Sequence, residues 1–309
     1  MRQGEIGSQG KWKGSATGGV KAPEAILLPD PNSRFAATAS RLQALAAGHP
    51  MAGWLSFMAQ LAQAQHVAAT ALPLPSSPDA SLVARCVEAR MPPLAADGHR
   101  RDPLWRDALR VLLERCDSGV IPPQAQAVIA DLRARDAEAM ERAADRFLHG
   151  EVEPADAGAL LYVAAALQIY FTKAAGAMRA ADLRLLPQRG LCPCCGSTPV
   201  AGLVTATGQT PGVRYLQCSL CSTQWNHVRA VCITCGGSRA IGLEGIEGDA
   251  GIVRAETCGD CHTYSKVIYQ AEDMGADPSA DDLASIGLDV LLAGADWARH
   301  APNPLLLVG

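Results

Sequence analysis

The chain has 309 residues, of which 49% are hydrophobic and 19% charged, and its formal net charge at pH 7 is −4. This length accommodates two or more domains with separate cores, and the composition is typical of a globular protein. The net charge gives no electrostatic reason to expect nucleic acid or an anionic membrane surface as a partner.

The N-terminal segment carries small and basic side chains. Residues 1–22 have neither an apolar stretch nor an adjacent arginine pair, so they match neither a secretory nor a twin-arginine signal. We therefore expect a flexible arm over these residues and a cytoplasmic protein. Stable disulfides are rare in the cytoplasm, so the 11 cysteines indicate metal sites or buried thiols.

Residues 23–185 are predicted to form an all-helical domain. Alanine is abundant there, which favours helix by intrinsic propensity. An apolar stripe with helical spacing runs from Trp105 to Cys116. The longest uncharged apolar run, residues 157–172, is shorter than the about 20 residues needed to cross a bilayer. We therefore expect that run to form a buried core helix.

After the helical region the composition changes to glycine, β-branched residues and cysteine, which is typical of short strands and tight turns. The sequence then becomes helical again near its end. We place a first four-cysteine module at residues 186–229, a second at 230–272, and a C-terminal helix and tail at 273–309. The expected fold class is therefore α plus small β.

A tandem repeat relates the two modules. Each contains the pattern C-x2-C-x22-C-x2-C, and every cysteine of the first pattern recurs 40 positions later. Intervening residues match in the same register, which indicates a duplication. The cysteines of the first copy are Cys192, Cys195, Cys218 and Cys221, and those of the second are Cys232, Cys235, Cys258 and Cys261.

Four cysteines in two C-x2-C turns form a tetrahedral metal site, because each turn places two sulfurs on one side of a knuckle. Each copy supplies a full set of ligands, so we predict one metal ion per copy. A cross-braced arrangement, in which Cys192 and Cys195 join Cys232 and Cys235, is the alternative. A site made only of thiolates suits zinc or iron alike, and the spacing does not separate these two metals.

The other three thiols are predicted not to bind metal. Cys194 aligns with Thr234 in the repeat, so it lies outside the duplicated pattern. Cys86 and Cys116 follow apolar residues at helical spacing, and we interpret both as small hydrophobic residues of the core.

Several polar or aromatic residues near the knuckles have alternative interpretations. We expect His227 and His262 to form hydrogen bonds or face solvent, since each site already has four ligands, and Trp225 to pack over a knuckle. We place Asp281 and Asp282 at the start of the C-terminal helix, where carboxylates interact favourably with the helix dipole. The sequence contains no P-loop, G-x-S-x-G or H-E-x-x-H motif, so we do not expect an enzyme.

Four segments closely resemble the FdhE family, the formate dehydrogenase accessory proteins of bacteria. They are GVRYLQCSLCSTQW, AETCGDCHTYSKVIYQ, ADDLASIGLDVL and NPLLL. The resemblance also reaches the helical half, through PEAILLPDP, RLQALAAGHP and LAQAQH, and so covers nearly the whole chain after the arm. The chain differs from the usual family pattern in having CPCCG for CPVCG, QWNH for EWH, and YSK for YLK.

The resemblance implies a cytoplasmic protein with a helical domain and two tandem modules of the rubredoxin-like or zinc-ribbon-like type. It implies that the eight repeat cysteines bind two metal ions, with iron favoured and zinc possible. It also implies binding to the catalytic subunit of a respiratory formate dehydrogenase, a molybdenum enzyme that is exported after assembly.

Three functions compete at this point. The first is assembly or maturation of that formate dehydrogenase, without turnover. The second is rubredoxin-like electron transfer, since iron held by four thiolates is a one-electron centre. The third, a zinc-ribbon nucleic-acid binder, is disfavoured, because residues 190–270 hold five basic and five acidic side chains and phosphate binding needs a positive surplus.

Overall fold

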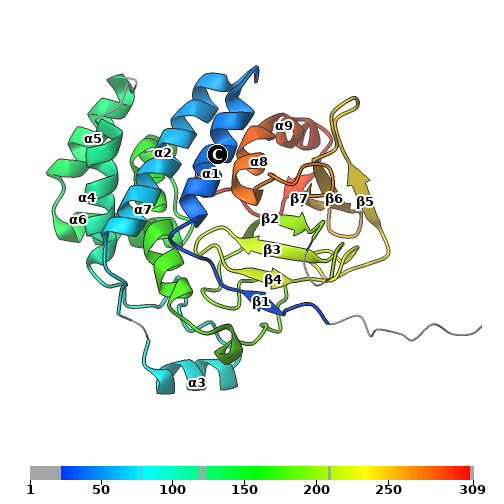
Figure 1. Cartoon of the computed structure of the whole chain (residues 1–309), viewed down its shortest axis with the longest axis horizontal. Coiled ribbons are helices and arrows are strands. Elements are labelled where there is room, and N and C mark those ends of the chain that lie inside the picture. The colour runs from blue at the N-terminus through cyan, green and yellow to red at the C-terminus, as the bar shows by residue number, and fades with distance from the viewer. Residues whose placement is uncertain (1–21, 77, 118–120, 122, 208–209, 307–309) are drawn as a thin grey trace, which may run out of the picture.

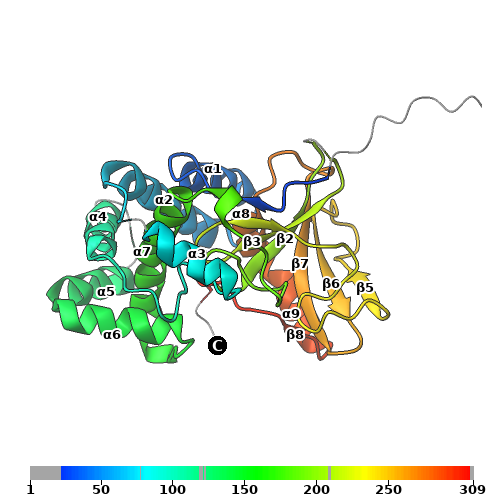
Figure 2. The same ribbon diagram turned by 90° about the horizontal axis from the view of Figure 1, so that it is seen from below.

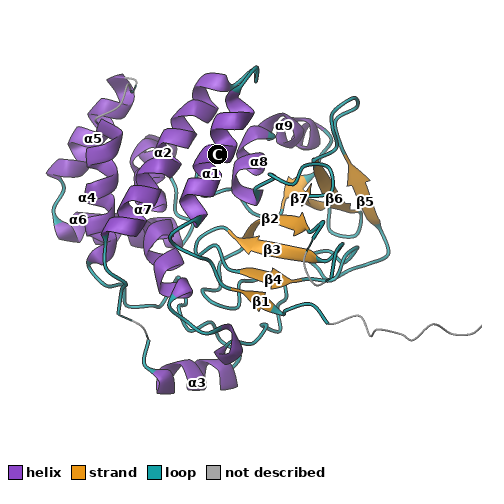
Figure 3. Cartoon of the chain, viewed as in Figure 1, coloured by secondary structure: helices purple, strands orange, loops and turns teal. Residues whose placement is uncertain are grey.

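The structure, a computed structural model, describes residues 22–306 except 77, 118–120, 122 and 208–209. Within these ranges a helical half lies beside a strand-rich half (Figures 1 and 3). This arrangement confirms the predicted fold class. The predicted N-terminal arm lies outside the described residues except at its last position, Ala22, and the predicted module boundaries remain a prediction.

The helical half is centred on α7. This helix contacts α2, α4, α5 and α6, and it is buried along most of its length because it is apolar on every side. The helical elements of this half are α1 (Arg34–Ala46), α2 (Ala52–Ala71), α3 (Ala80–Glu88), α4 (Leu104–Asp117), α5 (Pro123–Ala134), α6 (Ala137–Leu148), α7 (Ala157–Gly176) and the 3-10 turns η1 (Pro154–Asp156) and η2 (Ala180–Asp182).

The apolar run at 157–172 lies in α7, as predicted for a core helix. Together with η1 it spans Pro154–Gly176, which is long and apolar enough to cross a membrane by length and composition alone. In its most apolar stretch, however, 67% of the residues are buried inside the protein. Such burial against other helices is typical of the central helix of a folded domain.

The strand-rich half is one continuous sheet. The strand order is β1-β4-β3-β2-β7-β6-β5, and β8 also pairs with β7. Figure 2 shows β3, β2, β7, β6 and β5 in succession from the helical half outward. Its strands are β1 (Ile26–Leu27), β2 (Pro199–Val204), β3 (Arg214–Cys218), β4 (Gln224–Asn226), β5 (Ile241–Glu244), β6 (Val253–Cys258), β7 (Thr263–Tyr269) and β8 (Ala298–Arg299).

The pairing of β2 with β7 joins the two copies. It is parallel and brings Gly202 opposite Val267, whereas the pairs within each copy are antiparallel. The structure also adds a strand to the region predicted as all-helical: Ile26 of β1 pairs with Trp225 of β4. The segment before the first helix therefore forms an edge of the sheet.

Two helices, α8 (Pro278–Ala284) and α9 (Ile286–Gly294), replace the single C-terminal helix that the sequence predicts. The chain turns at Ser285, whose hydroxyl donates to the carbonyl of Asp281. The cap of α8 is Asp277, whose side chain accepts hydrogen bonds from two backbone N–H groups. Since α8 contacts α1, β2 and β7, it connects the two halves.

The hydrophobic core is distributed unequally between the copies. The largest cluster of buried side chains runs from the helical half into the first copy and includes its four repeat cysteines and Trp225. Two smaller clusters, around Ile268 and around Tyr264, serve the sheet and α9 near the second copy. The first copy is thus part of the main core, while the second lies at its edge.

Candidate metal centres

The structure brings the repeat cysteines together as two groups of four. In each group the four sulfurs lie within 4.8 Å of one another, and each group belongs to a single copy. The described cysteines therefore do not form the cross-braced alternative, in which one site would take sulfurs from both copies. Two clusters that could each bind a metal ion are therefore present. We call them the first tetrad (192, 195, 218, 221) and the second tetrad (232, 235, 258, 261).

The sulfur spacing fits a tetrahedral ion. In the first tetrad the Sγ atoms of Cys195 and Cys218 are 3.4 Å apart, and in the second those of Cys235 and Cys258 are 3.7 Å apart. A tetrahedron with metal–sulfur bonds of about 2.3 Å has sulfur–sulfur edges of about 3.8 Å. A four-thiolate ion therefore fits both tetrads with little movement.

The knuckle turns of the two copies share the same backbone hydrogen bonds. The N–H of Cys192 donates to the carbonyl of Ser197 over 2.9 Å, and that of Cys232 to the carbonyl of Gly237 over 2.8 Å. Gly196 and Gly236 take positive φ values of 79° and 75°, a conformation that glycine adopts at low cost. The duplication seen in the sequence therefore extends to the local backbone.

Backbone N–H donors and hydroxyl groups surround the sulfurs. The N–H groups of Cys194 and Thr234 each lie 3.4 Å from the first sulfur of their knuckle. The hydroxyl of Thr223 is 3.1 Å from Cys221 Sγ, and that of Thr263 is 3.1 Å from Cys261 Sγ. The N–H donors stabilise thiolates, and polar groups this close to the sulfurs would tune a bound metal. Sequence reasoning did not identify the two threonines, although they too are 40 residues apart.

The tetrads differ in burial. All four cysteines of the first are buried, whereas in the second Cys235 is exposed and Cys261 half-buried. In the first tetrad burial raises the pKa of Cys192 and Cys218 well above the ordinary value, whereas at Cys221 burial opposes ionisation but hydrogen bonds from the neighbouring thiols lower the pKa. A bound cation would favour the thiolate form of all four. In the second, burial opposes ionisation of Cys232, but backbone N–H groups lower its pKa to about 7.

The three remaining cysteines lie outside both tetrads. Cys194 is buried with its sulfur 3.6 Å from that of Met178, and Cys116 is buried in the helical core, where desolvation raises its pKa to about 12. Cys86 is only half-buried, and Leu82, one turn before it, is 38% exposed. The prediction of a core position is therefore wrong for Cys86.

The residues flanking the knuckles have structural roles. Trp225 is fully buried, and its indole donates to the carbonyl of Arg189 over 2.9 Å. His262 is exposed and stacks on Trp297. His227 is buried beside Arg214, and desolvation together with that guanidinium lowers its pKa to about 4. Neither histidine belongs to a tetrad.

Arg214 links the two copies, a role that sequence reasoning missed. Its buried guanidinium forms an ion pair with Glu256 of the second copy. It also donates to the carbonyls of Val228 and Val231 over 2.6 Å and 2.9 Å. These carbonyls belong to the segment between the tetrads, so Arg214 fixes how the second copy sits against the first.

The prediction of helix-start chemistry is confirmed for Asp281, which lies in the first turn of α8 and accepts from the backbone N–H of the cap residue Asp277 over 2.7 Å. Asp281 forms an ion pair with Arg41 of α1 over 2.7 Å, and burial raises its pKa although Arg41 opposes the shift. Asp282 is 3.3 Å from Lys266 Nζ and also pairs with Arg299. The two carboxylates therefore hold the helical half, the sheet and the C-terminal segment together.

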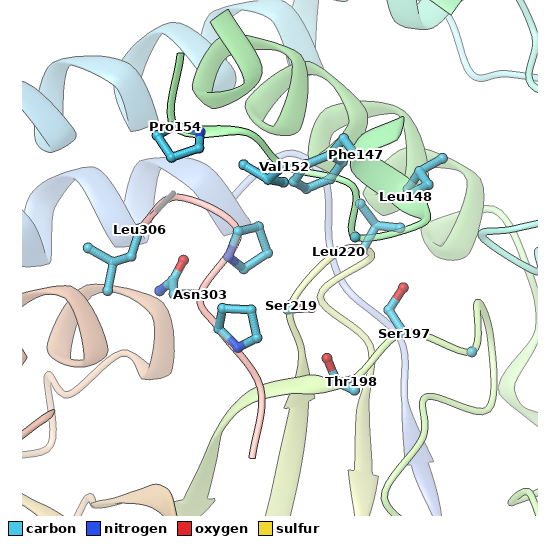
Figure 4. Close-up of a pocket in the computed structure, with 14 residues that line it drawn as sticks. Phe147, Leu148, Val152, Pro154, Ser197, Thr198, Ser219, Leu220, Asn303 and Leu306 are labelled. Atoms are coloured by element: carbon cyan, nitrogen blue, oxygen red, sulfur yellow. The ribbon is translucent and has the colours of Figure 1, made fainter. Parts of the chain in front are cut away.

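An apolar cavity of about 440 Å³ adjoins the first tetrad. Figure 4 shows Ser197 and Leu220, from its two knuckles, facing Phe147 and Val152. The C-terminal segment, including Asn303, closes another side. Residues next to both knuckles of the first tetrad therefore form part of the cavity wall.

The chain matches three family models in sequence order: "FdhE, N-terminal" over residues 23–187, "FdhE, central domain" over 191–229 and "FdhE, C-terminal domain" over 230–306. It is 34% identical over 296 residues to the protein FdhE homolog of Rhizobium meliloti, covering 95% of this chain and 96% of the relative. To the homolog of Edwardsiella ictaluri it is 35% identical over 300 residues, covering 96% and 95%.

A solved structure agrees with these relatives. The crystal structure of the FdhE protein from Pseudomonas aeruginosa superposes with a TM-score of 0.82 at 32% sequence identity. The match covers 92% of this chain and 99% of that one. The resemblance to the FdhE family, expected over nearly the whole chain after the arm, is therefore confirmed.

Proposed function

The chain belongs to the FdhE family, and we propose that it is an accessory protein that assists the assembly of a respiratory formate dehydrogenase by binding its catalytic subunit. In this proposal it acts in the cytoplasm and has no turnover of its own. The observation that carries the proposal is family membership over nearly the full length, combined with two complete cysteine tetrads.

In this proposal the eight repeat cysteines bind two ions, and we favour iron, as the resemblance implies. The Sγ distances of 3.4–3.7 Å support tetrahedral coordination of iron or zinc equally. A bound iron would supply one-electron chemistry, and the N–H and hydroxyl groups around the sulfurs would set its reduction potential. The chain itself holds the ion and orients the knuckles against the helical half.

The proposed role is tested in a bacterium that lacks its own FdhE homolog. We expect the wild-type chain to restore formate dehydrogenase activity and, when tagged, to retain the catalytic subunit. A Cys218→Ala variant, which breaks the first tetrad, should do neither, whereas Cys86→Ala, outside both tetrads, should do both. Unimpaired formate dehydrogenase activity in the strain without any FdhE protein would refute the proposal.

Electron transfer remains the second candidate, because one tetrad reaches the surface. Cys235 is exposed, so an ion there would lie close to a docked redox partner. A redox titration separates the candidates: a red iron form that is reduced and reoxidised reversibly at physiological potentials supports electron transfer. A purified native protein that contains only zinc rules it out, since zinc has no redox chemistry.

A further inference from the structure

Several of the equivalent positions that differ between the two copies change from an apolar or thiol side chain to a polar one, Cys194, Leu220 and Trp225 among them. The first copy has an apolar or thiol side chain at each position, and all three are buried. The second copy has a polar side chain at each, and two of the three are exposed. The equivalent pairs are Cys194 and Thr234, Leu220 and Asp260, and Trp225 and Ser265.

These differences change access to the sulfurs. Leu220, between the last two ligands of the first tetrad, is 3% exposed and belongs to the main core. Asp260 occupies the corresponding place in the second tetrad, faces solvent and lies beside Gly237, two residues after Cys235. Because the shell around a metal site controls its contact with solvent, the first tetrad is closed and the second is open.

A cleft of about 580 Å³ leads to the open tetrad. Cys232 and Cys235 line it, together with residues 187–190 and 227–228. Among the residues that line it, Arg189 carries a permanent charge and there is no carboxylate. An incoming thiolate would therefore pass a cation and no carboxylate along the cleft, while the carboxylate of Asp260 lies outside the lining, beside Gly237.

We propose that the two metal sites have different roles: the first tetrad holds a permanent structural ion, and the second holds an exchangeable ion that an external thiolate reaches through the cleft. The exchange is a ligand substitution. Cys235, the exposed ligand, would be displaced first, its bond to the metal breaking as a bond from the metal to the incoming sulfur formed. The other three cysteine sulfurs would be replaced in the same way by further donors, and each released thiolate would take up a proton from the solvent. The oxidation state of the metal does not change.

The proposal is tested on the purified full chain, loaded with zinc and challenged with glutathione as the external thiolate, while 4-(2-pyridylazo)resorcinol reports the zinc released; samples taken over time are quenched with excess N-ethylmaleimide. Zinc should leave in two phases of one ion each, with rates that differ by more than about tenfold, a barrier difference of about 1.4 kcal/mol. Mass spectrometry of peptides should find the cysteines of the second tetrad alkylated first. Release of both ions in one phase, or earlier alkylation of the first tetrad, would overturn the proposal.

A variant tests the cause of the difference. Asp260→Leu gives the second copy the leucine that the first copy has at the equivalent position, Leu220. This variant should slow the fast phase of zinc release by at least about threefold. Glu247→Leu removes an exposed carboxylate from the same module and should leave the rate unchanged. Equal slowing by both variants would contradict the assignment of access to Asp260. The alkylation order of the wild-type chain decides the main proposal even if Asp260→Leu does not fold.

The test uses the purified chain alone and measures metal release. Its outcome therefore does not depend on formate dehydrogenase, and failure of the proposed assembly function would leave it unaffected.

Discussion

Replacing equivalent cysteines in the two tetrads should have unequal consequences. Cys192 and Cys232 are first ligands of their copies, and their turns share the same hydrogen bonds. Cys192, however, lies in the main core with the helical half, while the second tetrad is partly exposed. We expect Cys192→Ala to lose the first ion and unfold the whole protein cooperatively, and Cys232→Ala to lose the second ion and disturb only its own module.

The magnitude follows from two quantities. Binding of a structural zinc ion contributes about 10–16 kcal/mol to folding, and the net stability of a domain is about 5–15 kcal/mol. The binding free energy of an ion inside the main core is therefore as large as the whole free energy of unfolding of such a domain. The second ion can contribute similarly, but mainly to a module whose local hydrophobic clusters are small.

The assay combines metal content, measured by mass spectrometry, with thermal unfolding followed by circular dichroism at 222 nm, which reports on the helical half. Cys232→Ala should keep one ion and a melting curve close to that of the wild type, while Cys192→Ala should melt far lower or be unfolded at 25 °C. Cys86→Ala is the matched control and should keep both ions. Equal loss of helical stability in the two variants, or two ions in either, would refute the reasoning.

Three further predictions concern single residues. Gly190→Ala should destabilise the fold by about 1–3 kcal/mol in chemical denaturation, because a Cβ there would lie 2.3 Å from the carbonyl oxygen of Ile233. The control Gly53→Ala should not destabilise the fold, because a Cβ at that position meets nothing within 4 Å. His227, with a pKa lowered to about 4, binds its proton more weakly in the folded than in the unfolded state, so its contribution is present above pH 6.5 and is lost as the pH falls toward 4. Between pH 7 and pH 5 the wild type should lose about 2 kcal/mol more stability than His227→Gln, and equal losses would contradict this. Cys194→Ser should retain two ions by elemental analysis, since its sulfur lies outside both tetrads; loss of an ion would make it a ligand.

The tetrads were predictable because their geometry is local. A C-x2-C turn with glycine at the left-handed position fixes two sulfurs through bonds within six residues, as between Cys192 and Ser197. The strand pairing within each copy, for example Cys218 opposite Pro199, then brings the second knuckle to the first. The repeat of 40 residues therefore carried most of the information needed to group the sulfurs by copy.

What the sequence did not predict depends on contacts between distant segments. The parallel pairing of β2 with β7, the edge strand at Ile26, and the ion pair from Arg214 to Glu256 join parts of the chain with no shared local pattern. Burial of the first tetrad was not predicted for the same reason: it comes from packing against the helical half, and, among the described residues, the second tetrad has no such packing. One signal was available in the sequence: Leu220 in the first copy is replaced by Asp260 in the second.

The central claim, that each copy holds its own ion, is tested most directly by anomalous diffraction from crystals of the protein purified without added metal. We expect two anomalous peaks per chain, each surrounded by the four sulfurs of one tetrad at about 2.3 Å. A single peak, or a peak bonded by sulfurs from both copies, would contradict the account.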